Sequence, residues 1–127
     1  MAKQVDSIVR IPCKVDGRFF KYWFEFLKPF HNLTGREMDI AACLVKHRYE
    51  LSKVIKDEEI LDKVVMSEDT RLKIMEECKV TLPYYQVIIS KLKKNNIIID
   101  NKIASNYIPH LEDENGNFKM MLLFEFS

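Results

Sequence analysis

The stretch that decides the fold spans residues 66–103 and reads MSEDTRLKIMEECKVTLPYYQVIISKLKKNNIIIDNKI. Ser67 is a favourable N-cap residue at its start. The apolar residues that follow recur at steps of three and four, which is the spacing of a buried helix face: Leu72, Ile74, Met75 and Cys78. The sequence therefore predicts a helix over 68–78.

A second helix is predicted to start almost at once, because Thr81 is another N-cap candidate and Pro83 suits a first helical turn. Its apolar stripe consists of Tyr85, Ile88, Ile89 and Leu92. The opposite face of a helix ending near Lys94 is then expected to point outward, and it carries Leu82, Tyr84, Gln86, Val87, Ser90, Lys91 and Lys94.

After this helix the pattern becomes β-rich over 97–99, turns at Asp100-Asn101 and returns over 102–103. The order of helix, tight turn, helix and hairpin resembles the winged helix-turn-helix family, including small winged-helix proteins of bacteriophages. The matching features are Arg71 with Ile74 behind it, the V-T-x-x-x-Y turn at 80–85, and the run KLKKNNIII at 91–99.

This resemblance implies a non-enzymatic protein that binds double-stranded DNA in transcription or replication control. The second helix would enter the major groove and the hairpin would lie on the backbone. Gln86 suits adenine, and lysines suit phosphates. The candidate DNA-binding residues are Thr81, Tyr84, Gln86, Ser90, Lys91, Lys94, Asn101 and Lys102.

A second interpretation is a structural module for protein–protein assembly, for instance a subunit of a phage head–tail connector ring. The formal net charge is only +1, and the outward face includes apolar residues that read bases poorly. The candidate interface residues are Phe19, Trp23, Leu27, Leu82, Tyr84 and Val87. Either interpretation implies a macromolecular partner and a homo-oligomer, without a membrane or a small-molecule substrate.

The flanking segments complete an α+β fold with one domain over residues 1–127. A β-hairpin is predicted over 5–28 around Asp16-Gly17, which leaves Phe19, Trp23 and Leu27 either covered by the chain's own helices or part of an interface. Residues 33–105 would form the winged helix-turn-helix core. A helix running to about residue 49 begins at the capping box of residues 34–37, and residues 51–66 are expected to contain a short amphipathic helix or a helical linker. A second hairpin is predicted over 106–127.

Catalytic and metal-binding motifs are not apparent from spacing. His31, His47 and His110 are read as isolated from each other and from the cysteines, and the three glycines leave little for a phosphate-binding loop. Cys13, Cys43 and Cys78 are odd in number and lie among apolar neighbours, which favours reduced core residues and a cytoplasmic setting. We therefore expect no enzyme activity, no metal and no cofactor, in the host cytoplasm or, for an assembly subunit, in the virion.

Overall fold

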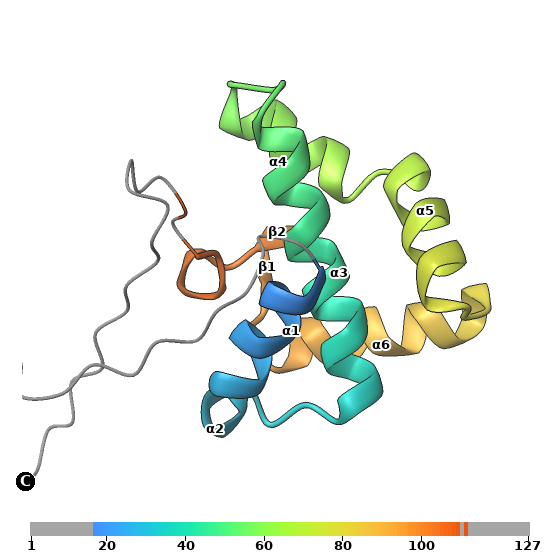
Figure 1. Cartoon of the computed structure of the whole chain (residues 1–127). Coiled ribbons are helices and arrows are strands. Elements are labelled where there is room, and N and C mark those ends of the chain that lie inside the picture. The colour runs from blue at the N-terminus through green and yellow to red at the C-terminus, as the bar shows by residue number, and fades with distance from the viewer. Residues whose placement is uncertain (1–16, 110, 112–127) are drawn as a thin grey trace, which may run out of the picture.

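The computed structural model describes residues 17–109 and residue 111. This part of the chain is mostly helical and contains one small antiparallel sheet of two strands (Figure 1). The elements, in chain order, are α1 Gly17–Phe26, α2 Lys28–His31, α3 Gly35–Ser52, α4 Glu58–Val65, α5 Glu68–Cys78, α6 Leu82–Lys94, β1 Ile98–Ile99, β2 Lys102–Ile103 and the 3-10 helix η1 Ser105–Tyr107.

Helix α3 is the centre of the fold, and α1, α4, α5 and α6 all pack against it (Figure 1). The predicted capping box is confirmed: the Thr34 hydroxyl accepts from the backbone N–H of Glu37, and the Glu37 carboxylate accepts from that of Thr34. Both bonds satisfy backbone groups that a helix start leaves unpaired. The buried residues of α3 are Ile40, Ala41, Ala42, Cys43, Leu44, Val45 and His47.

The predicted boundaries of α5 are confirmed, and Ser67 caps it by accepting from the N–H of Thr70. The predicted buried face is wrong at one position, because Leu72 is 52% exposed. The buried residues of this helix are Thr70 and Ile74, four positions apart. Thr70 tolerates burial because its hydroxyl donates to the carbonyl of Val64 at 2.7 Å.

Helix α6 and the hairpin after it also follow the prediction. The Thr81 hydroxyl caps α6, and Tyr85, Ile88 and Leu92 are buried on its inner face. Strands β1 and β2 pair with Ile98 opposite Ile103 and Ile99 opposite Lys102. Asp100 and Asn101 form the two-residue turn, both with positive φ, as a type I′ turn requires.

Lys79 ends α5 in the left-handed conformation, with φ 54° and ψ 53°. A side chain with a Cβ is strained there, whereas glycine is not. We expect Lys79→Gly to raise the free energy of unfolding by up to about 1 kcal/mol. The matched control is Lys73→Gly inside the same helix, which should lower it by about 1 kcal/mol. Urea denaturation measures both changes, and a loss of stability in Lys79→Gly would contradict the expectation.

The predicted N-terminal hairpin is wrong in its second arm, which is helix α1 in the structure. Its apolar residues satisfy the helical period as well as an alternating one, since Phe19, Phe20, Trp23, Phe24 and Leu27 all lie on one buried face. The helical period prevails because it buries Phe19 and Trp23 together with Phe20 and Phe24 against α3, whereas a strand would point these two pairs to opposite faces. The first arm, residues 5–16, lies outside the described residues.

The C-terminal hairpin prediction falls largely outside the described residues, which in this region reach only residue 109 and residue 111. Where the two overlap, Tyr107 lies in a 3-10 helix instead of a strand. Its ring is buried and stacks on Phe24, with ring centroids 6.1 Å apart. None of the described helices combines the length and apolar character needed to cross a membrane.

Candidate functional site

The outer face of α6 presents most of the predicted DNA-binding residues on one surface. Tyr84, Val87, Lys91 and Lys94 follow each other at steps of three and four, so they lie along one side of the helix. All are exposed except Lys91, which is half-buried. The other exposed candidates on this helix or at its N-cap are Thr81, Gln86 and Ser90.

Charge is unevenly distributed around this surface. Residues 79–102 contain five lysines and one aspartate, whereas the whole chain has a formal net charge of only +1. Helix α6 itself contains no carboxylate, and three of the lysines lie in its last turn. The four acids of the preceding helix, Glu68, Asp69, Glu76 and Glu77, all belong to α5 and not to α6. The outer face of α6 is therefore a local cationic surface on a nearly neutral chain.

The hairpin candidates Asn101 and Lys102 are exposed, but Lys102 lies in a different electrostatic setting. It lines a cavity of about 350 Å³ together with Glu58 and Asp62 of α4. Strand β1 packs on α6, whereas β2 packs on α4. The structure thus groups the α6 candidates and places Lys102 beside acidic residues.

The predicted protein-interface residues divide into two groups. Phe19, Trp23 and Leu27 are buried in the chain's own core, and the Trp23 indole N–H donates to the carbonyl of Tyr107 at 2.8 Å. Of the two explanations left open for them, coverage by the chain's own helices is the one observed. Leu82, Tyr84 and Val87 are exposed on α6, and Val87 is 65% exposed.

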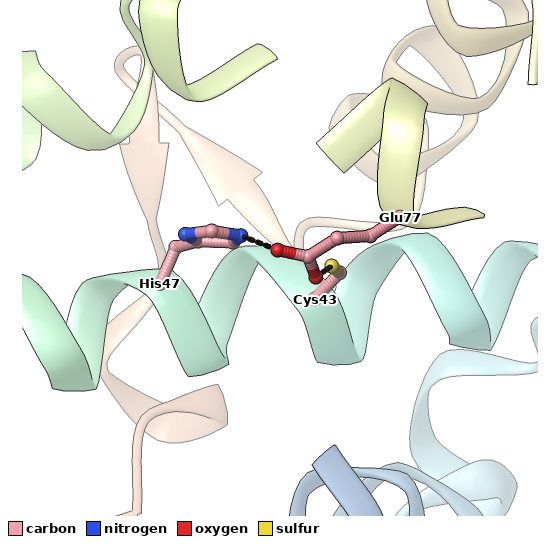
Figure 2. A group of neighbouring side chains, drawn as sticks. All are labelled: Cys43, His47 and Glu77. Carbon is pink, nitrogen blue, oxygen red and sulfur yellow. Dashed lines mark hydrogen bonds and ion pairs between the residues drawn. The ribbon is translucent and has the colours of Figure 1, made fainter. Parts of the chain in front are cut away.

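A second site, which the sequence did not reveal, lies between α3 and α5. Figure 2 shows Cys43 and His47 projecting from one face of α3 toward Glu77, which reaches across from α5. The Cys43 thiol donates to Glu77 Oε2 at 3.0 Å, and His47 Nε2 lies 2.9 Å from Glu77 Oε1. Since an ionised carboxylate only accepts, Nε2 carries a proton in this arrangement. The metal-ligating atoms of the three side chains lie within 4.8 Å of one another.

Glu77 is held in its charged form. Its partial burial opposes ionisation, but hydrogen bonds from Lys46 and Cys43 outweigh this effect and lower the pKa of Glu77 to about 2. The Lys46 ammonium lies 2.7 Å from Glu77 Oε2. At neutral pH the carboxylate is therefore a fixed negative charge that ties α5 to α3.

Cys78, the last residue of α5, adds a second thiol to this group. The neighbouring Cys78 thiol, burial and the hydrogen bond to Glu77 all raise the pKa of Cys43, whereas the neighbouring Cys43 thiol lowers the pKa of Cys78. Both thiols line a cavity of about 320 Å³ whose remaining lining residues are Lys21, Arg36, Asp39, Ala42, Lys46, Glu77 and Lys79. Because the thiolate is the nucleophilic form, the raised pKa makes Cys43 a poor nucleophile at neutral pH.

The expectation that His47 is isolated from the cysteines is thus wrong. The Cys43-x-x-x-His47 spacing places both side chains on one face of a helix, and this signal was present in the sequence. The contribution of Glu77 and Cys78 depends on how α5 packs on α3. His31, in contrast, is a core residue: Nε2 donates to the Phe24 carbonyl at 2.6 Å and Nδ1 accepts from the Leu33 N–H at 3.0 Å.

Comparisons with protein-family models, with curated proteins and with solved structures give no match for this chain.

Proposed function

We propose that this chain is a non-enzymatic winged helix-turn-helix protein that binds double-stranded DNA. In this proposal α5 and α6 form the helix-turn-helix, α6 enters the major groove, and the β1–β2 hairpin is the wing. The observation that carries the proposal is the outer face of α6, which is exposed, free of carboxylates and rich in lysine at its C-terminal end. The same fold and surface are compatible with a protein of phage type.

The geometry supports distinct tasks for the residues on this face. A single α-helix fits the major groove of B-DNA, where Gln86 and Ser90 would face base edges. Lys91 and Lys94 lie further along the helix, where an ammonium group would meet a phosphate. Lys102 contributes less in this proposal, because Glu58 and Asp62 share its cavity.

The lysines of α6 give the sharpest test of the proposal. We expect the double variant Lys91→Ala/Lys94→Ala to bind duplex DNA more weakly, because binding releases fewer counterions from the DNA when phosphate contacts are lost. The slope of log Kobs against log salt should become shallower by about 0.9 for each contact, or about 1.8 for the pair. Fluorescence anisotropy with a labelled duplex at several salt concentrations measures both effects.

The matched control is Lys56→Ala/Lys63→Ala, which removes two exposed lysines at the loop before α4 and on α4 itself. It changes the net charge of the chain by the same amount but leaves α6 intact. We expect its salt slope to equal that of the unmodified protein. Equal losses in both variants would mean that the affinity reflects net charge alone and would overturn the assignment of α6.

A second candidate function, protein assembly, is favoured by the exposed apolar residues on the same face. Leu82, Tyr84 and Val87 are aliphatic and aromatic side chains of the kind that form the centre of protein interfaces. Sedimentation velocity of the chain with and without duplex DNA separates the two functions. Self-association that Tyr84→Ala abolishes, with DNA remaining free at physiological salt, would favour an assembly subunit, such as one of a phage connector ring.

A further inference from the structure

The side chains between α3 and α5 form a set of donors that has no part in the proposed contact with DNA. Cys43, His47 and Glu77 bring one sulfur, one nitrogen and one oxygen ligand atom within 4.8 Å of one another (Figure 2). Cys78 supplies a second thiol, which lines the same cavity as Cys43. Thiolate, imidazole and carboxylate are together the usual ligands of zinc in proteins.

We propose that Cys43, His47, Glu77 and Cys78 bind a thiophilic divalent metal ion of the zinc class at the junction of α3 and α5. Tetrahedral zinc with bonds of 2.0–2.3 Å places its ligand atoms roughly 3.3–3.8 Å apart. The ligand atoms of Cys43, His47 and Glu77 lie 2.9 and 3.0 Å apart at Glu77 and within 4.8 Å overall, so these three need only side-chain adjustments to reach this geometry. Cys78 would approach from the same cavity as the fourth ligand.

Access and exclusion of water both suit a metal site. The two thiols line a cavity of about 320 Å³, so an ion can reach them without unfolding of the helices. Cys43 and His47 are nevertheless buried among the residues of α3. Two ligands come from one helix at a four-residue spacing, which fixes their separation, and two come from the end of the neighbouring helix.

Charge compensation favours a metal held by thiolates. Binding releases one proton from each thiol to solvent, and the imidazole of His47 takes the tautomer with its proton on Nδ1. Two thiolates and the Glu77 carboxylate then carry three negative charges around a divalent ion, which leaves one negative charge. Lys46 already pairs with Glu77 at 2.7 Å, so its positive charge balances the one that remains.

The test is a titration of the reduced, untagged full chain with Co²⁺, followed by displacement with Zn²⁺. We expect thiolate-to-cobalt charge-transfer absorption in the near ultraviolet and the visible bands of a tetrahedral ion. Cys43→Ser should weaken binding at least about tenfold and remove roughly half of the charge-transfer intensity, as should Cys78→Ser. Glu77→Gln, at the more exposed ligand, should weaken binding while leaving both thiolate contributions present.

The third cysteine supplies the matched control, since Cys13→Ser should leave the cobalt spectrum unchanged. A spectrum without thiolate bands, or one that Cys43→Ser does not alter, would overturn the proposal, and an unchanged spectrum in Cys78→Ser would overturn the fourth ligand. Because a substitution in buried α3 can impair folding, a second experiment uses the unmodified chain. Zn²⁺ should protect Cys43 and Cys78 from alkylation without protecting Cys13, and equal alkylation with and without zinc would exclude the site.

Discussion

Replacing Phe24 with alanine is expected to lower the free energy of unfolding by about 3–5 kcal/mol. The Phe24 side chain is 0% exposed, and its ring packs against the rings of His31 and Tyr107, at centroid distances of 5.6 and 6.1 Å. Truncation would leave a cavity between α1 and the residues after the hairpin. The rigid surroundings would fill that cavity only in part.

The same helix offers the matched control for this variant. Phe26 is 50% exposed, so Phe26→Ala removes the same atoms from a site that is half in water already. We expect a change of less than about 1 kcal/mol, because surface substitutions usually have small effects. Urea denaturation monitored by circular dichroism measures both variants. Similar losses for Phe24→Ala and Phe26→Ala would contradict the helical assignment of residues 17–26.

A second large effect is expected from acidification, through His31. This histidine is 1% exposed, and burial lowers its pKa from the ordinary value of 6.5. The bond to the Phe24 carbonyl opposes this shift, whereas the charge of Lys28 adds to it. Its two ring nitrogens already have partners in the neutral form. A second proton, on Nδ1, would face the Leu33 N–H, which is itself a donor.

The direction of the pH effect follows from the lowered pKa. Below pH 6.5 the unfolded chain takes up a proton on this residue, but the folded chain does so only at a lower pH. The stabilising contribution is therefore complete above about pH 6.5 and declines as the pH falls, by at most about 1.4 kcal/mol per pH unit. Urea denaturation at a series of pH values between about 7.5 and 5.5, which span about one unit on each side of the ordinary pKa, measures this slope.

His31→Gln separates this residue from the other groups that titrate in the same range. Glutamine can still donate to the Phe24 carbonyl but does not ionise, so the variant should show a shallower decline of stability with falling pH. We also expect it to lose about 1–3 kcal/mol at pH 7.5, because at least one buried backbone group is left without its partner. The same slope in both proteins would show that His31 is not the residue responsible.

Much of the fold was predictable because its signals are local. Ser67, Thr81 and the capping box at Thr34 each mark a helix start within four residues, and the Asp100-Asn101 turn fixes the register of the hairpin around it. Such signals depend on hydrogen bonds between near neighbours in the chain. These signals therefore do not depend on how the rest of the molecule packs.

Most of the wrong predictions concern residues whose structure depends on contacts between segments that are distant in the sequence. The aromatic residues of 17–28 satisfy two periods, and packing against α3 selects the helical one. Leu72 is apolar but exposed, whereas the polar Thr70 is buried and donates to the carbonyl of Val64. For the cluster of Cys43, His47 and Glu77, the sequence indicated only the four-residue spacing of Cys43 and His47 on one helix. Its completion by Glu77 required the packing of α5 on α3, which no local pattern encodes.

Two hydrogen bonds that close very long stretches of chain have a consequence for folding during synthesis. The Trp23 indole N–H donates to the carbonyl of Tyr107, which is synthesised 84 residues later. The carbonyl of His31 accepts from the side-chain amide of Asn95, which is synthesised 64 residues later. A ribosome adding about 5–20 residues per second delays these partners by several seconds. Helices α1 and α2 must therefore spend that interval with their aromatic face unfinished, at the stage when a nascent chain is most open to chaperones and to aggregation.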